Sequence, residues 1–153
     1  MTSSHPNQPE YNRIAVTVDS DRQNRVIVEQ LRRTLADVVA VYRFGSTAQG
    51  TATGASDVDV AVLTRERILP ERRFDVQEAL AAKIGRDVDL LDLASASPVM
   101  AIQVVAGGHL LYDGDTDARG RFEDMTFSMY ARLNEERRGI LERVAAERTV
   151  YGR

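Results

Sequence analysis

The stretch FGSTAQGTATGASDVDVAVL, residues 44–63, decides how the rest of the chain is interpreted. It begins at the end of a β-branched run, VVAVYRF, and continues into a glycine–serine pair, Gly45 and Ser46. It ends with a second run, DVDVAVL, in which polar and apolar residues alternate, and alternation with a period of two is typical of a strand. We therefore predict two strands, one ending at Gly45 and one covering residues 57–63, joined by a loop of small residues.

The second predicted strand carries two aspartates on one face. Asp57 and Asp59 point the same way because side chains alternate along a strand, while Val58, Val60 and Val62 point into a core. Two carboxylates at this spacing repel each other unless a cation lies between them. Mg²⁺ prefers oxygen ligands and often adds a substrate phosphate, and two such ions roughly 4 Å apart serve displacement at phosphorus. The pair therefore indicates phosphoryl chemistry.

The glycine–serine turn supplies the other half of the predicted site. Gly45 lets the backbone approach a phosphate closely, and Ser46 can donate both its hydroxyl and its N–H group. Backbone N–H groups at the start of a short helix bind anions. We therefore expect a triphosphate cradle beside a metal clamp.

The remaining elements follow from periodicity and helix caps. Residues 1–12 read as a disordered lead, and Ile14 to Val18 as a short strand or the extended entry to a helix. Asp19 or Ser20 is a candidate N-cap for that helix, which is expected to end near residue 36. Pro70 is expected to break the pattern before a helix over residues 74–84.

The second half of the chain alternates in the same way. Residues 87–93 predict a strand, and Ser97 with Pro98 predicts a capped helix that ends at residues 107–108. HLLYDGD predicts a short strand and a turn. A long helix is expected over residues 116–146, with one apolar side: Phe122, Met125, Met129, Leu133, Ile140 and Val144. Helices alternating with short strands indicate an α/β (α+β) fold, a single domain over residues 13–153.

The composition is that of an ordinary globular protein. Hydrophobic residues make up 43% and charged residues 28% of 153 residues, enough for one domain with a core. The formal net charge of −3 does not favour a nucleic-acid backbone or an anionic membrane. The absence of cysteine excludes thiolate metal sites and a cysteine nucleophile. With no secretory signal and no membrane-spanning run, the chain is expected to be cytoplasmic and not to bind nucleic acid directly.

The spacing of the motif resembles a known signature. Gly45-Ser46, ten residues, then Asp57-x-Asp59 is similar to the pattern of the DNA polymerase β-type nucleotidyltransferase superfamily. The short chain and the run VDLLDLASASPVMAIQVVAGGHLLYDGD, followed by a charged helix, resemble the minimal nucleotidyltransferase (MNT) antitoxins of HEPN/MNT (type VII) toxin–antitoxin modules. The resemblance covers roughly residues 30–148. It implies the minimal nucleotidyltransferase fold: a small mixed sheet flanked by helices, with a long C-terminal helix.

The resemblance also implies a third carboxylate on a neighbouring strand. Asp89 is the first choice, because relatives carry it in a similar V-D-L run. Asp87 shares the face of Asp89 and Asp92 lies on the opposite one, so both stay open as substitutes. Asp57, Asp59 and Asp89 are then the implied catalytic residues and ligands of Mg²⁺, with two ions expected.

The implied activity is protein AMPylation. In the resembling family the antitoxin transfers AMP from ATP to a tyrosine near the RNase site of a HEPN-domain toxin, which silences the toxin. Gly45 and Ser46 are implied to bind the nucleotide, and Asp89 to act as base.

One feature departs from the family: many relatives carry arginines where Thr47 and Gln49 stand here, and neither side chain contacts a phosphate bidentately.

Two alternatives remain open. The chain could neutralise its partner by one-to-one binding with a degraded site, or it could act on a small molecule or an RNA end. The retained aspartates and the glycine–serine pair favour a working enzyme.

The long helix over residues 116–148 could cover its own sheet, or it could dock a partner, since its second half, RLNEERRGILERVAAER, is highly charged.

Overall fold

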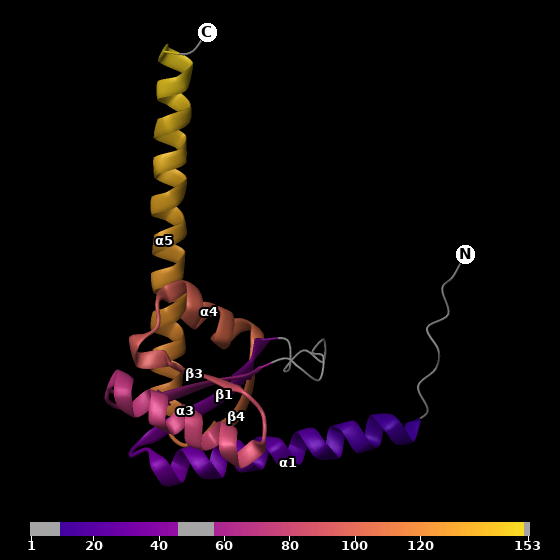
Figure 1. Cartoon of the computed structure of the whole chain (residues 1–153). Coiled ribbons are helices and arrows are strands. Elements are labelled where there is room, and N and C mark those ends of the chain that lie inside the picture. The colour runs from indigo at the N-terminus through magenta and orange to yellow at the C-terminus, as the bar shows by residue number, and fades with distance from the viewer. Residues whose placement is uncertain (1–9, 46–56, 152–153) are drawn as a thin grey trace, which may run out of the picture.

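The computed structural model describes residues 10–45 and 57–151 (Figure 1). The elements confirm the predicted mixed α/β class and the long C-terminal helix. In chain order they are α1 (Glu10–Thr34), β1 (Val38–Phe44), β2 (Val58–Thr64), α3 (Pro70–Ile84), β3 (Val88–Asp92), the 3₁₀ turn η1 (Leu93–Ser95), α4 (Pro98–Gly107), β4 (His109–Asp113) and α5 (Thr116–Tyr151).

The strands form a small mixed sheet, as expected. Their order across the sheet is β3-β2-β1-β4. β1 pairs antiparallel with both β2 and β4, whereas β2 and β3 run parallel. A parallel pair needs a crossover connection, and α3 provides it. Because β2 and β3 run parallel and β1 runs against them, the start of β2, the start of β3 and the end of β1 meet at one end of the sheet.

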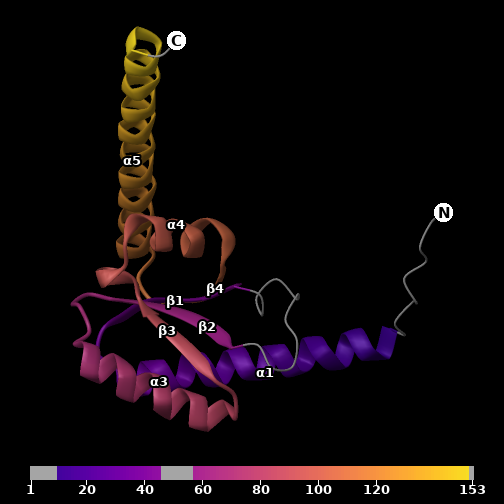
Figure 2. The same cartoon turned by 45° about the horizontal axis from the view of Figure 1, so that its top comes forward.

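Helices cover both faces of the sheet (Figure 2). On one face, Ile27 and Leu31 of α1 and Val76 and Leu80 of α3 pack on the strand valines, including Val60. The other face carries α4 and the first part of α5, which pack on a second buried cluster. Central positions of β2 are therefore buried on both faces, which explains why the polar–apolar alternation is lost after its first residues.

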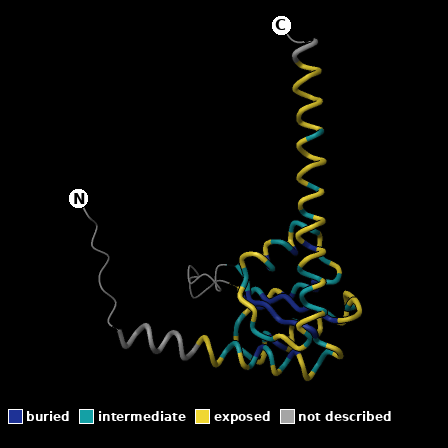
Figure 3. Tube along the Cα trace, turned by 180° about the vertical axis from the view of Figure 1, so that it is seen from behind, coloured by how far each residue is buried: buried dark blue, intermediate teal, exposed yellow. Residues whose placement is uncertain are grey.

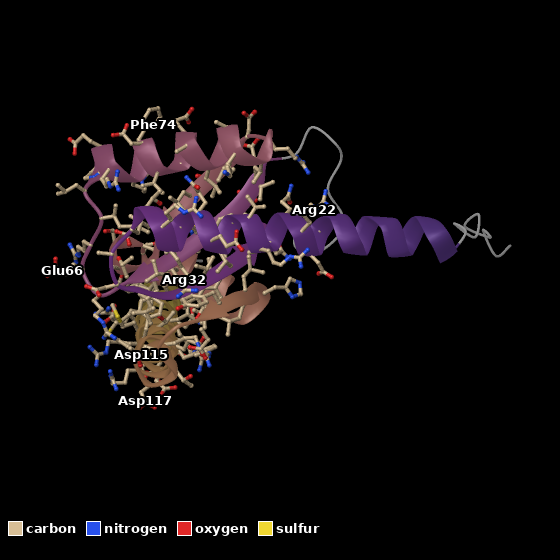
Figure 4. The ribbon with its side chains drawn as sticks, turned by 90° about the horizontal axis from the view of Figure 1, so that it is seen from below. Arg22, Arg32, Glu66, Phe74, Asp115 and Asp117 are labelled. Atoms are coloured by element: carbon tan, nitrogen blue, oxygen red, sulfur yellow. The ribbon has the colours of Figure 1, made fainter. Side chains whose placement is uncertain are left out.

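Both helix layers are tied to the strands by polar contacts. The guanidinium of Arg32 on α1 lies over the ring of Tyr112 on β4, 4.6 Å from the ring centroid (Figure 4). On the other face the hydroxyl of Tyr42 on β1 donates to Glu123 of α5 over 2.6 Å. Burial, together with the neighbouring Glu123, raises the pKa of Tyr42 well above its usual range.

The N-terminal helix differs from the prediction. α1 begins at Glu10, so residues 14–18 are helical rather than extended, and neither Asp19 nor Ser20 is an N-cap. Residues 10–12 of the expected lead are helical too, and residues 1–9 lie outside the described part of the chain. An isolated extended segment has no partner for its backbone groups, whereas lengthening an existing helix adds one hydrogen bond per residue. β-Branched side chains lower helix propensity only slightly, so they do not stop it.

The other helices keep the predicted signals and shift some bounds. Pro70 begins α3 instead of ending the preceding pattern, because the first helical position needs no N–H partner. Ser97 caps α4 as predicted, its hydroxyl accepting from the N–H of Met100 over 3.3 Å. α5 continues past the predicted residue 146 to Tyr151. No helix in the described part of the chain is long and apolar enough to cross a membrane.

Candidate functional site

Two of the predicted carboxylates are direct neighbours across the sheet. Asp59 on β2 and Asp89 on β3 are register partners in the parallel pair. Val58 and Val60, on either side of Asp59, are fully buried against α1 and α3, so the carboxylate of Asp59 lies on the opposite face. The parallel register therefore brings two acidic side chains together at the end of the sheet where β1 ends.

Asp57, the other predicted carboxylate of the 57–59 pair, interacts with Asp59 and Asp89. Asp57 is exposed and directly precedes β2. Burial raises the pKa of Asp59 above its ordinary value, and the negative charges of Asp89 and Asp57 raise it further. Asp59 is thus the central member of a group of three acidic side chains whose like charges raise its pKa.

Gly45 lies against this cluster from the end of β1. Phe44 pairs with Asp59 across the antiparallel ladder, so the next residue passes close to its carboxylate. A Cβ atom built on Gly45 would collide with Oδ2 of Asp59 and would lie 3.0 Å from its Cγ. Gly45 also has a φ of 74°, a left-handed conformation that favours glycine. The backbone at Gly45 therefore approaches Asp59 closely, and its predicted approach to a phosphate stays a prediction.

The two substitute carboxylates differ from Asp89. Asp92 is buried and its carboxylate accepts from the N–H of Ile68 at 3.0 Å, the N–H of Ala94 at 3.2 Å and the hydroxyl of Ser95 at 2.8 Å. These bonds hold the turn after β3 and occupy both oxygens. Asp87 is exposed and precedes β3, where its carbonyl accepts from the N–H of Val58. Asp89 is thus the one of the three that pairs in register with Asp59.

The donor set fits a magnesium ion that shares its ligands with a substrate. Within residues 10–45 and 57–151, no three acidic or histidine side chains converge closely enough to hold a metal ion on their own. Mg²⁺ usually binds through one or two carboxylates and completes its shell with water and phosphate oxygens. The acidic cluster, with its raised pKa at Asp59, matches this open arrangement better than a closed protein cage.

Several predicted residues lie outside the described part of the chain. Ser46, the second member of the predicted nucleotide-binding pair, is among them, as are Thr47 and Gln49. The two basic residues closest to the motif do not take the place of the missing arginines on the carboxylate face. Arg43 is buried on the α1 side, where it donates to Asn24 over 2.8 Å, and burial together with the charge of Arg86 lowers its pKa.

Arg65 is at the other end of β2. It bonds Asp115, ahead of α5, over 2.7 Å; Figure 4 labels Asp115 there, beside the base of α5. A cleft of about 400 Å³ lies at this same far end, lined by residues that include Thr34, Asp37 and Arg72. That cleft is therefore separate from the acidic cluster.

Sequence reasoning missed the contacts that fix the end of β1. Asn24 of α1 accepts from Arg43, two residues before Gly45. Arg86, which precedes β3, lowers the pKa of Arg43 through its like positive charge, after the larger effect of burial. Neither residue stands in a recognisable motif, because each acts on Arg43 from an element far apart in the sequence.

The sequence and the fold match known proteins. Residues 26–117 match the family model described as Polymerase beta, Nucleotidyltransferase. The chain is 38% identical over 120 residues to the protein adenylyltransferase MntA of Shewanella oneidensis, which covers 78% of this chain and 86% of that protein.

Solved structures with the same fold come from toxin–antitoxin complexes. A crystal structure of a toxin–antitoxin with AMP-PNP contains a chain that is 37% identical, with a TM-score of 0.72, covering 80% of this chain and 98% of that one. A second match belongs to the tri-AMPylated HEPN toxin of Shewanella oneidensis in complex with its MNT antitoxin, at 33% identity and a TM-score of 0.67, over 80% of this chain and 96% of the other.

Proposed function

Because the chain belongs to the polymerase beta nucleotidyltransferase family, we propose that it is an antitoxin-type protein adenylyltransferase. It transfers AMP from ATP to a tyrosine hydroxyl of a HEPN toxin and thereby neutralises the toxin. The observation that carries the proposal is the register pairing of Asp59 with Asp89 beside Gly45, in a chain 38% identical to a protein adenylyltransferase. The match to a complex with AMP-PNP supports ATP as the nucleotide.

The residues take distinct roles in this proposal. Gly45 and Ser46 bind the triphosphate through backbone N–H groups and the serine hydroxyl. Asp57, Asp59 and Asp89 bind Mg²⁺, with two ions expected, because they form one cluster of like charges with oxygen donors. When bound, the ions supply positive charge where negative charge develops on the phosphate oxygens.

Asp89 accepts the proton of the attacking hydroxyl. The hydroxyl oxygen forms a bond to the α-phosphorus of ATP, and the bond from that phosphorus to the bridging oxygen of the β-phosphate breaks. Pyrophosphate leaves with the electron pair of the broken bond, and the proton of the hydroxyl goes to the carboxylate of Asp89. Proton acceptance in such a step contributes about 10²–10⁴-fold to the rate.

The acceptor is proposed to be a protein. One matching structure holds a tri-AMPylated HEPN toxin with its MNT antitoxin, which supports a HEPN toxin as partner here. The described part of the chain offers no second domain that would close the space in front of Asp59, and a bound toxin would close it. The cytoplasm is the proposed location.

Intact mass of a co-expressed HEPN toxin tests the proposal. We expect incubation with this protein, ATP and Mg²⁺ to add one or more units of about 329 Da, the mass of one AMP addition, with no addition after chelation of the metal. The Asp57→Asn/Asp59→Asn variant should add none while still binding the toxin.

Stoichiometry separates catalysis from one-to-one blocking. A catalyst modifies an excess of toxin and leaves it inactive after separation of the two proteins, whereas a blocker protects only an equal amount. An unmodified toxin in a stable one-to-one complex would show that the protein neutralises by binding, and the proposed transfer would be wrong.

A further inference from the structure

The second half of α5 stands apart from the rest of the described chain. Thr126 is the last buried residue of α5 up to residue 148, where the description of burial ends, and beyond Thr126 the helix projects away from the sheet and the other helices (Figures 1 and 3). Large apolar side chains in this part are exposed, with Ile140 at 52%, Leu141 at 67% and Val144 at 42% of their full accessibility. Exposed apolar side chains clustered on one helix face mark an interaction surface.

Side chains in this part of α5, one half-buried and four exposed, follow a heptad pattern. Leu133, Arg137, Ile140, Val144 and Glu147 alternate at spacings of four and three residues, which places all five on one face of the helix. We call these five residues the α5 seam. Two of its members are charged, and neither takes part in an ion pair within the described part of the chain. A charged residue in such a seam specifies the partner and the register.

The α5 seam is complementary to itself when reversed. Arg137 and Glu147 are equally far from position 142, and so are Ile140 and Val144. An antiparallel copy centred at this position therefore sets Arg137 against the second copy's Glu147, and Ile140 against the second copy's Val144. Two apolar layers then lie between two outer layers, and each outer layer pairs an arginine of one copy with a glutamate of the other.

We propose that the α5 seam binds a second copy of this chain as an antiparallel two-helix coiled coil. The residue beside the α5 seam supports a second copy as the partner, because Leu141 would face Leu141 of the second copy and extend the apolar contact. Arg143 would face Arg143 on the other flank, which opposes pairing and is exposed to solvent, where such repulsion is weak.

The rest of the molecule leaves room for this arrangement. At about 1.5 Å per residue, the last buried residue of α5, Thr126, lies about 24 Å from the centre at position 142. The end of the second helix, residue 151, reaches only as far as Leu133. The two globular parts therefore lie at opposite ends of the coiled coil and do not collide. Since the seam covers only about two heptads, pairing should be reversible and dependent on concentration.

Sedimentation velocity of charge-swap variants tests the proposal, because it reports the mass of each protein in solution. We expect the wild-type chain to shift from 17.0 kDa toward twice that mass as its concentration rises. Arg137→Glu and Glu147→Arg should each stay monomeric, because each sets like charges against each other in both outer layers. The double variant Arg137→Glu/Glu147→Arg should dimerise again. An equimolar mixture of the two single variants should form heterodimers, because their charges are opposite in every layer.

A neighbouring arginine provides the matched control. Arg138 follows Arg137 directly but lies outside the seam, so Arg138→Glu should dimerise like the wild type. The proposal is overturned if the wild type stays at 17.0 kDa up to about 1 mM, where even millimolar affinity gives measurable pairing. It is also overturned if Arg138→Glu dissociates the dimer as Arg137→Glu does, or if the double variant fails to recover. If the wild type is monomeric and the variants of the α5 seam no longer bind the toxin, the seam binds the toxin and not a second copy of this chain.

Discussion

The carboxylate of Asp59 fills the space in which any side chain at position 45 would have to lie. Gly45 is therefore required twice, once for its φ of 74° and once for this contact. The glycine of the proposed nucleotide-binding turn and the central aspartate of the acidic cluster are thus parts of one packing arrangement, and a change at one displaces the other.

Gly45→Ala should damage both stability and activity. The left-handed backbone costs a non-glycine residue about 1–2 kcal/mol of unfolding free energy, and the new methyl group must displace the Asp59 carboxylate. A displacement of about 1 Å near the chemistry lowers a rate about 100-fold. Denaturant unfolding and the initial rate of AMP transfer measure the two effects.

Gly85→Ala separates strain from displacement. Gly85 has nearly the same φ, 70°, but no atom lies within 4 Å of a Cβ built there. This variant should lose a similar free energy of unfolding and keep the wild-type transfer rate. Equal losses of activity in the two alanine variants would contradict a direct role for the contact between Gly45 and Asp59.

Asp89 and Asp92 should respond in opposite ways to substitution. Asp89→Asn is expected to unfold at a denaturant concentration no lower than that of the wild type, because it relieves repulsion with Asp59, and to lower AMP transfer at least about 100-fold, as loss of one charge-stabilising group does. Asp92→Ala removes a buried acceptor of three hydrogen bonds, so it should cost about 3 kcal/mol of unfolding free energy. A stable but inactive Asp92→Ala protein would assign the third carboxylate to Asp92.

Asp59→Asn should stabilise the metal-free protein at neutral pH. The pKa of Asp59 is raised on folding, so the folded state binds its proton more tightly than the unfolded state. Its ionisation therefore lowers stability as the pH rises above about 3.9, the ordinary value of aspartate. We expect a higher Tm than wild type at pH 7 in EDTA and a smaller difference near pH 3.

Magnesium provides the second arm of that experiment. Ions that bind the acidic cluster stabilise the folded state by mass action. Wild-type protein with ATP and Mg²⁺ should therefore gain Tm, whereas the asparagine variant should gain less. A lower Tm for Asp59→Asn in EDTA would show that Asp59 contributes a stabilising contact rather than repulsion.

The sequence predicts the elements that local chemistry defines. Alternation in residues 57–63 predicts β2, and Ser97 with Pro98 predicts the start of α4. These signals act within a few residues, so a sequence shows them directly. The start of α1 and the position of Pro70 in α3 were predicted wrongly, because the same residues are compatible with more than one local structure and the surrounding fold decides between them.

The arrangement of the site is less accessible from sequence. The common face of Asp57 and Asp59 follows from strand periodicity, but the pairing of Asp59 with Asp89 depends on the register between β2 and β3. No local signal sets that register, which depends on how α3 packs across the sheet. The hydrogen bond that Asp92 accepts from the N–H of Ile68 likewise joins segments far apart in the chain. The sequence alone therefore left Asp87, Asp89 and Asp92 open as the third carboxylate, and the structure distinguishes them.

Ionisation of Asp115 should stabilise the folded protein, whereas ionisation of Asp59 destabilises it. It precedes α5, where one carboxylate oxygen accepts from the N–H of Ala118 over 3.0 Å and the other pairs with Arg65. The bond to Ala118, followed by that to Arg65, lowers the pKa of Asp115. Its contribution to stability is therefore present above about pH 3.9 and is lost as the pH falls through the lowered value.

Asp115→Asn isolates this effect because the amide oxygen still accepts from Ala118 while the charge is gone. We expect a lower Tm than wild type at pH 7, by a small amount since the pair with Arg65 is exposed, and the same Tm as wild type near pH 2. Asp117→Asn is the matched control, since it removes a charge two residues further along, in the first turn of α5, without those two contacts. If both variants lower Tm equally, the general charge at the start of α5 stabilises the helix, and the specific contacts of Asp115 do not.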